Sequence, residues 1–391
     1  MGALYVRRRP DGRGRPASLG LLGALVIGLG LTVVLPASGA ARWSTGSSPS
    51  PGGESTLNGV SCVVAGSCTA VGYFGDSTLI ESWNGSTWSI VRGPDRGTDS
   101  ILNGVSCVSV SSCAAVGSYA SSGLSRAFAE SWKGTAWSVA PSPSLVATES
   151  ALNGVSCVSA SSCTAVGYSG EDTLVESWNG TAWSVVPSPS LVPSRSAFNG
   201  VFCVSDTSCV AVGNDGSRAL VESWNGAAWS VVPSPTPGHY GGLSSVSCSS
   251  ARSCVAVGNY SNGTGSGTST LSRSLIESWN GSTWSIVPGP SPSVAYLYGV
   301  SCISARSCKA VGDYASSLGA FWALVESFNG TTWSIVPGPR PSVAYLYGVS
   351  CVSTRSCKAV GEHANSSGVV RTLVESWNGT AWTVRPKSQA D

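Results

Sequence analysis

Fourteen cysteines in seven evenly built pairs constrain the fold of this 391-residue chain more than any other feature of its sequence. Five residues separate the two cysteines of every pair, and successive pairs begin 45, 50, 46, 45, 54 and 49 residues apart. Self-similarity at this period indicates a repeat architecture in which each copy folds as one supersecondary unit. The pairs account for all of the cysteines: Cys62/Cys68, Cys107/Cys113, Cys157/Cys163, Cys203/Cys209, Cys248/Cys254, Cys302/Cys308 and Cys351/Cys357.

The copy over residues 152–187 gives the plainest view of the unit. We expect four strands in it, because its runs of β-branched and aromatic residues are short and are separated by turn residues. Asn179-Gly180 links the last two strands as a hairpin, since both residues accept a positive φ at low cost. The four runs are residues 154–158, 163–168, 173–178 and 183–186.

Four short strands and their turns fill the period well, whereas a coil of a β-solenoid usually needs about half this length. Seven contiguous units over residues 57–387 therefore predict an all-β fold, a seven-bladed β-propeller of four-stranded antiparallel blades. No domain boundary interrupts the units. Residues 293–302 and 342–351 are identical, which indicates a late internal duplication of units six and seven.

Three runs of the unit resemble the kelch repeat of galactose-oxidase-type propellers. Residues 164–168 resemble its glycine-ended second strand, residues 175–178 its aromatic-closed third strand, and residues 183–189 its tryptophan-opened fourth strand with a proline-rich link. The likeness extends over all seven units, but this chain has one glycine where kelch has two, and it adds the cysteine pair. The resemblance implies a propeller and no single activity, because kelch-type propellers include binding scaffolds and an enzyme.

Residues 1–40 have the outline of a secretory signal peptide. Five arginines within residues 1–17 precede an apolar run over 19–36, and small residues at 37–41 offer cleavage after Ala40. The apolar run is near 18 residues long, so an uncleaved membrane anchor is the alternative. Removal of residues 1–40 leaves 17 basic and 19 acidic residues, a balance that gives no indication of nucleic-acid binding.

Residues 41–56 form a linker rich in Ser, Gly and Pro, and residues 388–391 form a short tail. Trp43 lies 19 residues before Cys62, and Trp88 has the same spacing to Cys107. The segment around Trp43 is therefore in phase with the fourth strand of a unit, and it could help to close the ring beside the last blade. The alternative is a disordered mature N-terminus, because the seventh unit already has its own Trp382.

Export, the even number of cysteines and their identical spacing predict one disulfide within each blade. Zinc is the rival, but structural zinc sites prefer closer cysteine pairs, and the chain has only two histidines, His239 and His363. Each bridge closes a very short loop, so the loop-entropy argument gives about 2 kcal/mol apiece. We expect no metal and no other cofactor.

Two features recur in the units and are for that reason expected to serve the fold. A glutamate in the third strand is expected to bond to neighbouring backbone or to an adjacent blade, with a cation-holding ring of acids as the rival. A tryptophan pair is expected to pack between blades, with sugar platforms as the rival. The glutamates are Glu81, Glu130, Glu176, Glu222, Glu277, Glu326 and Glu375. The pairs run from Trp83/Trp88 to Trp377/Trp382, and Phe328 replaces the first tryptophan in unit six.

The loops of the unit divide into two sets that lie on opposite faces of the ring. The loop inside each cysteine pair and the Asn-Gly turns are nearly constant, whereas the second-to-third-strand turns and the links between blades vary. Function is commonly carried by loops on a rigid scaffold, so the variable face is the candidate binding surface. Aromatic residues beside polar groups suit a glycan or protein ligand, although ordinary loop packing also explains each one. The candidates are Tyr119, Arg126, Asp215, Tyr260, Tyr296, Asp313, Tyr314, Phe321, Trp322 and Tyr345.

The constant face carries a group of basic residues in units five to seven. Such a group would suit an anionic polymer, but more often these charges simply solvate a surface. The residues are Arg252, Arg306, Lys309, Arg355 and Lys358.

Catalysis has little support in the sequence, and we name no catalytic residue. Two scattered histidines cannot supply the copper ligands of galactose oxidase, and Glu171 and Asp172 point apart on a strand, which makes a poor glycosidase dyad. We therefore expect a non-enzymatic binding or interaction module, secreted or at the cell surface, with a glycan or protein partner. It would contact a membrane only through an uncleaved N-terminal segment. The alternatives are an extracellular carbohydrate-active enzyme (a lyase or hydrolase) and a structural envelope protein; the oligomeric state is not indicated.

Overall fold

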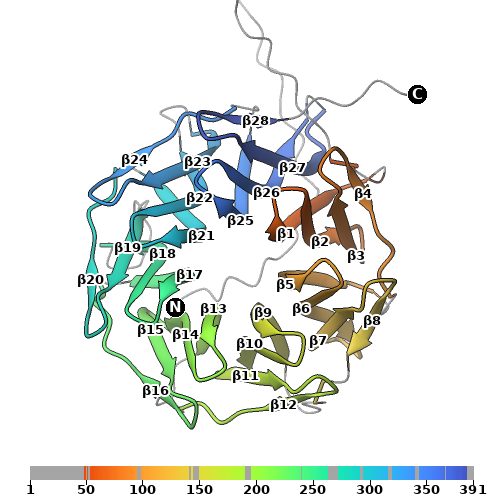
Figure 1. The fold of residues 1–391 in the computed structure, drawn as a ribbon, viewed down its shortest axis with the longest axis horizontal. Coiled ribbons are helices and arrows are strands. Elements are labelled where there is room, and N and C mark those ends of the chain that lie inside the picture. Colours follow the sequence, from red (N-terminus) through yellow and green to blue (C-terminus); the bar gives the residue numbers. More distant parts are fainter. Residues whose placement is uncertain are drawn as a thin grey trace, which may run out of the picture.

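Seven four-stranded antiparallel sheets stand as blades around a central opening (Figure 1). This computed structural model describes residues 48–49, 51, 53–94, 98–140, 142–143, 149–189, 195–238, 240–262, 272–290, 294–315, 319–339, 343–365 and 367–384. The predicted signal peptide (1–40), Trp43 and the tail (388–391) lie outside these residues. The predicted seven-bladed, all-β propeller is confirmed.

Each blade consists of four strands that are consecutive in the chain. The first blade is β1 (Ser55–Val64), β2 (Ser67–Phe74), β3 (Ser77–Trp83) and β4 (Trp88–Ile90); the second is β5 (Ile101–Ser109), β6 (Ser112–Ser121), β7 (Leu124–Trp132) and β8 (Trp137–Ala140). The third is β9 (Ser150–Ser159), β10 (Ser162–Ser169), β11 (Asp172–Trp178) and β12 (Trp183–Val185); the fourth is β13 (Ser196–Ser205), β14 (Ser208–Asp215), β15 (Arg218–Trp224) and β16 (Trp229–Val231). The fifth is β17 (Tyr240–Ser250), β18 (Ser253–Ser261), β19 (Arg273–Trp279) and β20 (Trp284–Ile286). The sixth is β21 (Ala295–Ser304), β22 (Ser307–Ala315), β23 (Phe321–Phe328) and β24 (Trp333–Ile335), and the seventh is β25 (Ala344–Ser353), β26 (Ser356–Ala364), β27 (Val370–Trp377) and β28 (Trp382–Val384).

The first strand of a blade is longer than the sequence pattern predicts. In the third blade β9 begins at Ser150, four residues before the expected start, and the first blade likewise begins at Ser55 instead of residue 57. Polar residues at the start of these strands hid them from a pattern search. Ser55 and Ser150 are nevertheless buried.

A bulge that recurs in all seven blades explains why the second strand of each blade carries a glycine. The register between β9 and β10 shifts beside Gly167, so that the carbonyl of Ala151 lies directly over the α-carbon. A Cβ on Gly167 would come within 1.9 Å of that carbonyl oxygen, and the same holds for Gly72 and the carbonyl of Thr56. No side chain fits at this position, so the Ala-Val-Gly run of each unit follows from backbone geometry.

The core lies between neighbouring blades and is repeated around the ring. Leu297 of β21, for example, is fully buried and packs with Val257 and Ile276 of the preceding blade. The first strands are the innermost, and adjacent ones contact each other around the opening. Alternate residues of each strand face opposite neighbours, which makes each blade depend on both of its neighbours for burial.

The ring closes between the seventh and first blades without any exchange of strands. Val360 and Val374 of the seventh blade pack against Leu57 and Leu79 of the first. The segment that precedes β1 bridges the same boundary, because Ser48 receives a hydrogen bond from Thr372 of the seventh blade and donates to Glu81 of the first. The predicted role of the linker in closure therefore finds support at Ser48, although Trp43 lies outside the described residues.

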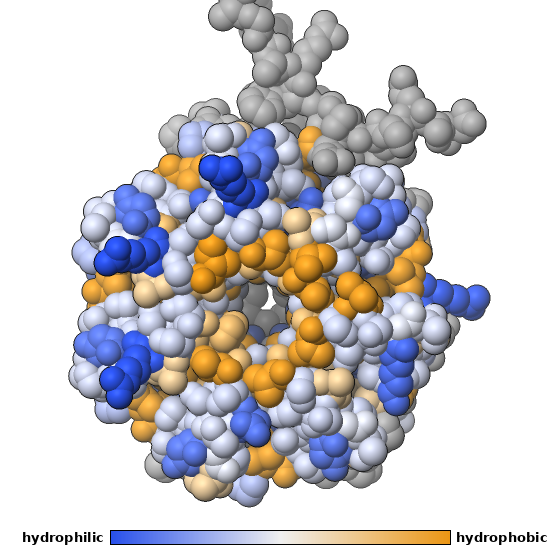
Figure 2. Space-filling view, in the orientation of Figure 1, coloured by the Kyte–Doolittle hydropathy of each residue, from blue (hydrophilic) through white to orange (hydrophobic). Residues whose placement is uncertain are grey.

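Figure 2 shows one face of the ring, with apolar residues gathered around the central opening and hydrophilic residues towards the rim.

Among the described residues no helix is long and apolar enough to cross a membrane.

Candidate binding site at the variable face

All seven predicted disulfides are present, each joining two residues that face each other across the first hairpin of a blade. The bridges are Cys62–Cys68, Cys107–Cys113, Cys157–Cys163, Cys203–Cys209, Cys248–Cys254, Cys302–Cys308 and Cys351–Cys357. Zinc, the rival for these cysteines, is therefore excluded at every pair, because none of the fourteen is a free thiol.

The cysteines serve the fold, as predicted: each bridge joins the first two strands of a blade. The second cysteine of every bridge is buried, with only 2–7% of its surface exposed: Cys68, Cys113, Cys163, Cys209, Cys254, Cys308 and Cys357. Cys209, Cys254, Cys308 and Cys357 lie in core clusters that combine residues of neighbouring blades.

Carbonyl groups of the same hairpin surround these buried sulfurs. The distance from Sγ to the nearest carbonyl oxygen is 3.7 Å for Cys209 and Ser205, and 3.8 Å for Cys254 and Ser250. It is 3.9 Å for Cys308 and Ser304 and 4.0 Å for Cys357 and Ser353. A disulfide sulfur carries no hydrogen to donate, so these are packing contacts and not hydrogen bonds.

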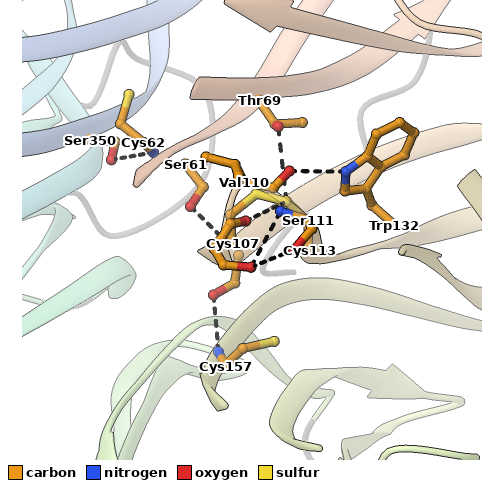
Figure 3. Close-up of a disulfide and its surroundings, with 12 residues drawn as sticks. Ser61, Cys62, Thr69, Cys107, Val110, Ser111, Cys113, Trp132, Cys157 and Ser350 are labelled. Atoms are coloured by element: carbon orange, nitrogen blue, oxygen red, sulfur yellow. Dashed lines mark hydrogen bonds between the residues drawn. A yellow bond between two sulfur atoms is a disulfide. The ribbon is translucent and has the colours of Figure 1, made fainter. Parts of the chain in front are cut away.

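In the described residues, hydrogen bonds from the cysteine backbone link six of the seven blades to the preceding blade. Figure 3 shows the Cys107–Cys113 bridge and its surroundings. The Cys107 amide donates to the Ser61 hydroxyl of the preceding blade at 3.0 Å, and the Cys157 amide donates in the same way to Ser106. This link recurs at the Cys62, Cys203, Cys302 and Cys351 amides.

The recurring tryptophans belong to the core, as predicted. The two rings of each pair lie 5.6–5.9 Å apart, and those of the fourth strands are mostly buried. The third-strand tryptophan also donates from its indole nitrogen to a carbonyl in the cysteine loop, as Trp132 does to Val110 at 3.1 Å. Burial of the fourth-strand rings argues against sugar platforms there, whereas the third-strand rings of Trp132, Trp224, Trp279 and Trp377 are partly exposed.

The recurring glutamates are fully buried in strands of seven different sheets. Four of them accept a hydrogen bond from a serine in the link before their blade: Ser48 to Glu81, Ser142 to Glu176, Ser188 to Glu222 and Ser234 to Glu277. Burial raises the pKa of Glu81 to about 8 and those of the other three to about 7, while the serine offsets part of the rise. The predicted bond to an adjacent blade is confirmed for these four. The cation-holding ring finds no support, since no three His, Cys, Asp or Glu of the described residues could hold a metal ion.

In the links that precede the sixth and seventh blades, Gly289 and Gly338 occupy the position of the serine that bonds to the glutamate in other blades. A Cβ on Gly289 would lie 3.6 Å from Oε2 of Glu326, and one on Gly338 would lie 3.4 Å from Oε2 of Glu375. Neither carboxyl has a hydrogen-bond partner among the described residues. Burial raises the pKa of Glu326 to about 7 and that of Glu375 to about 8.

The basic group predicted on the constant face is smaller than expected. Lys309 and Lys358 are buried, and their ammonium groups lie 4.1 and 4.0 Å from the ring centroids of Trp377 and Trp83 in the next blade. Their inclusion in a surface patch was wrong, because a lysine can place its charge over a tryptophan face. The other three residues, Arg252, Arg306 and Arg355, are exposed.

Several of the predicted ligand-binding residues lie apart from one another on the variable face. Tyr119 stands edge-on to Phe128, with 5.7 Å between ring centroids, and Tyr260 packs against a core cluster. Arg126 lies opposite Tyr119 in the β6–β7 ladder. Asp215 accepts from the Arg218 amide at 3.1 Å and so caps its own turn.

The sixth and seventh blades hold the remaining candidates, with Tyr314 and Trp322 as a separate pair and the others close to one another. Tyr314 stands edge-on to Trp322 with 5.9 Å between centroids, and Phe321 stacks on Tyr345 of the next blade at the same distance. Asp313 lies opposite Tyr296 in the β21–β22 ladder and is buried. Burial raises the pKa of Asp313 to about 7, and the Tyr298 hydroxyl offsets part of that rise. Neither Asp313 oxygen makes a well-formed hydrogen bond with a described residue.

Three further residues complete this group, and the pattern of candidate loops did not identify them. Tyr298 and Tyr347 lie two residues after Tyr296 and Tyr345 on the innermost strands, and Glu362 accepts from the Tyr347 hydroxyl at 2.9 Å. Glu362 also accepts a hydrogen bond from Thr56 across the closure of the ring. We call Tyr296, Tyr298, Phe321, Tyr345, Tyr347, Asp313 and Glu362 the tyrosine cluster.

The rings of the tyrosine cluster form a continuous chain. Tyr296 and Tyr298 are nearly parallel at 6.3 Å between centroids, Tyr345 and Tyr347 are nearly parallel at 6.2 Å, and Tyr298 meets Tyr347 at 5.4 Å. All four tyrosines are partly exposed. They lie near the start of β21 and β25, which places the cluster at the variable-face end of the central opening.

A break in the repeat could have revealed the missed tyrosines. In the first four blades the position of Tyr298 is an asparagine, whose amide donates to a carbonyl of the next blade at 2.8–3.0 Å. The sixth and seventh blades replace this structural residue with tyrosine. A position that departs from a repeated structural role is a better candidate for function than an aromatic residue in a loop.

No protein-family model and no curated protein matches the chain, but solved structures resemble it. It is similar to "YCF48 bound to D1 peptide", with 12% identity and a TM-score of 0.54 over 89% of this chain and 100% of that chain. It is also similar to a PL25 ulvan lyase bound to -[GlcA(1-4)Rha3S]-, with 9% identity and a TM-score of 0.60 over 86% and 97%. A third similar structure is U3-55K, with 11% identity and a TM-score of 0.54 over 83% and 96%. At these identities the likeness shows the fold alone.

Proposed function

We propose that the protein is an exported, non-enzymatic, kelch-like propeller that binds a glycan or protein ligand at the cell surface or outside the cell. The tyrosine cluster carries this proposal. Partly exposed aromatic rings with carboxylates and hydroxyls beside them suit recognition of sugar faces or of apolar and polar groups of a protein. In the two blades that hold the cluster, Tyr298 and Tyr347 stand where the first four blades have a structural asparagine.

Export is supported by the seven disulfides, which indicate an oxidising environment outside the cytosol. The predicted signal peptide, or alternatively the membrane anchor, supplies the route. Among the described residues no cysteine is free.

Binding without turnover is favoured by the surroundings of the carboxyl groups. Asp313 is buried, and Glu362 is held by Tyr347 and Thr56. A catalytic acid or base must reach the proton it transfers, and these two groups are instead placed to support the tyrosines.

A carbohydrate-active enzyme is the second candidate. It draws on the pKa of Asp313, raised to about 7 beside Tyr298, because a carboxyl titrating near neutral pH can exchange a proton with a substrate. The polysaccharide lyase to which the chain is similar in structure is bound to -[GlcA(1-4)Rha3S]-.

The test is a screen of the purified exported protein against a glycan array, cell-wall polysaccharides and extracellular proteins. A variant carrying Tyr298→Asn and Tyr347→Asn is screened in parallel, since asparagine is the residue that the first four blades use at this position. Saturable binding by the native protein that the variant loses supports the proposal. Binding retained by the folded variant contradicts the site, and release of unsaturated or reducing ends from a polysaccharide contradicts the non-enzymatic function.

A further inference from the structure

We infer that the tyrosine cluster binds a glycan that carries protonated amines, that is, a polymer of amino sugars. This inference rests on the proposed function, since it names the class of ligand for the same site. Tyrosine faces, two carboxyl groups and the charges around them carry it.

The tyrosine rings of the cluster are well suited to a cation. A cation is attracted to the negative face of an aromatic ring within about 6 Å of its centroid. The Tyr347 hydroxyl donates to the Glu362 carboxylate, and the Tyr298 hydroxyl lies beside Asp313. A phenol that donates to a carboxylate gains electron density, so its ring face attracts a cation more strongly.

In the part of the chain that the structure describes, the carboxyl groups of the cluster are not engaged in direct ion pairs. Among the described residues, neither Asp313 nor Glu362 forms an ion pair with a lysine, arginine or histidine. Arg371, which lies near Glu362 on the neighbouring strand β27, donates instead to the carbonyl of Gly53 at 2.8 Å. Glu362 therefore has no direct ion-pair partner among the described residues, and an incoming ammonium group would supply one.

The arrangement occurs twice, on equivalent strands of neighbouring blades. Tyr296 lies opposite Asp313 in one ladder, and Tyr345 lies opposite Glu362 in the other. Units six and seven differ in their second strands, yet both place an acid at this position, where the other blades have Tyr, Ser or Asn. Two adjacent half-sites suit a ligand that repeats the same group along its length, as a polymer of amino sugars does.

Sugar rings also account for the parallel tyrosine pairs. The planes within each pair differ by only 4° and 9°, which leaves flat apolar faces of the kind that stack on pyranose rings. The tyrosine hydroxyls beside these faces can accept the hydrogen bonds of sugar hydroxyl and ammonium groups, while the carboxyl groups behind them act on an ammonium group through their charge.

The experiment is calorimetric titration of the full exported protein with a glucosamine hexamer and with its fully N-acetylated counterpart. The two probes share length, linkage and ring shape and differ in the positive charge. We expect saturable binding of the glucosamine hexamer at least tenfold tighter than that of the acetylated hexamer. Equal binding of both hexamers overturns the inference and leaves the proposed binding function standing. Binding of neither hexamer overturns the inference, and it removes the proposed function as well only if the screen of glycans and extracellular proteins is also negative.

Charge-removing variants assign the effect to the cluster. Glu362→Gln keeps an acceptor for Tyr347 and Thr56, and we expect it to weaken binding of the glucosamine hexamer about tenfold with little effect on the acetylated hexamer. Asp313→Asn is expected to act in the same direction. Glu171→Gln is the matched control, because it removes one charge from an exposed turn of the third blade, where Glu171 pairs with Arg195 at 3.5 Å. An equal loss in the control would show nonspecific attraction and overturn the inference. Tighter binding of a hexalysine peptide than of the glucosamine hexamer would also overturn the inference, because it would show that charge without sugar rings is sufficient.

Discussion

Replacing Gly338 by serine should stabilise the protein, because it supplies the hydroxyl that Glu375 lacks. Four other glutamates of the same ring accept a bond from a link serine, for example Ser188 to Glu222 at 2.8 Å. A Cβ at residue 338 would lie 3.4 Å from Oε2 of Glu375 and would meet no other atom within 4 Å. A hydroxyl oxygen one bond further on can therefore reach hydrogen-bond distance without moving its neighbours.

The size of the gain follows from the state of the carboxyl group. A hydrogen bond to a charged group contributes about 1.5–3 kcal/mol, and one between neutral groups about 0.5–1.5 kcal/mol. Replacing glycine adds about 0.4–1 kcal/mol by restricting the unfolded chain. Gly338→Ala isolates that second contribution and is the matched control.

Thermal unfolding measures the difference between the two variants. With about 2.1 cal/mol/K of unfolding entropy per residue, roughly 330 residues of propeller give a shift of about 3 °C for 2 kcal/mol. The gain of Gly338→Ser over Gly338→Ala should be larger at pH 9 than at pH 5, because burial raises the pKa of Glu375 to about 8 and only the charged form gains the stronger bond. A serine variant no more stable than the alanine variant at either pH would refute the reasoning.

Three further outcomes follow from the same contacts. Burial raises the pKa values of the glutamates from an ordinary 4.5 to about 7 to 8 in the folded protein. Their contribution to stability is therefore fully present below about pH 4.5 and is lost as the pH rises through 7 to 8. Calorimetry should give a higher Tm at pH 5 than at pH 9, and the reverse order would contradict this. Ser48→Ala should cost about 0.5–1.5 kcal/mol at pH 5 and about 1.5–3 kcal/mol at pH 9, as Ser188→Ala should, since both donate to a buried glutamate that is neutral at the lower pH and charged at the higher one. A loss confined to Ser188→Ala would show that the N-terminal segment does not close the ring. The double change Cys157→Ser and Cys163→Ser should cost about 2 kcal/mol in denaturant unfolding, and a much larger loss would mean that the bridge does more than close a short loop.

The fold was predictable because its local signals recur in all or nearly all of the seven units. The cysteine period, the Asn-Gly turns and the strand composition all favoured the same four-stranded unit, and repetition separated structural residues from chance. The full length of the first strands was not predictable, since Ser55 and Ser150 are polar and buried. Such burial depends on the neighbouring blade, which local pattern does not contain.

The candidate site was only partly predictable. Tyr296, Asp313, Phe321 and Tyr345 were named from their loops, but the same rule also named Tyr119, which stands against Phe128 of its own blade instead. Loop position does not say which rings meet, because the contacts join strands far apart in the sequence. The pairing of Tyr347 with Glu362 could have been sought at positions where the repeat departs from its own pattern.

Lys309 and Lys358 illustrate the opposite error. Charge alone suggested a surface, but each lysine lies over a tryptophan of the following blade and donates to a serine of its own blade at 2.7 Å. Whether a charged side chain of this chain is exposed or buried therefore depends on how one blade packs on the next.

Hydrogen exchange, followed by mass spectrometry with and without the glycan that the screen identifies, tests the central claim most directly. If the tyrosine cluster is the binding site, ligand should slow exchange in peptides that cover residues 295–299 and 344–348, and peptides from the cysteine loops should be unchanged. Protection confined to the constant face, around Arg252, Arg306 and Arg355, would contradict the account.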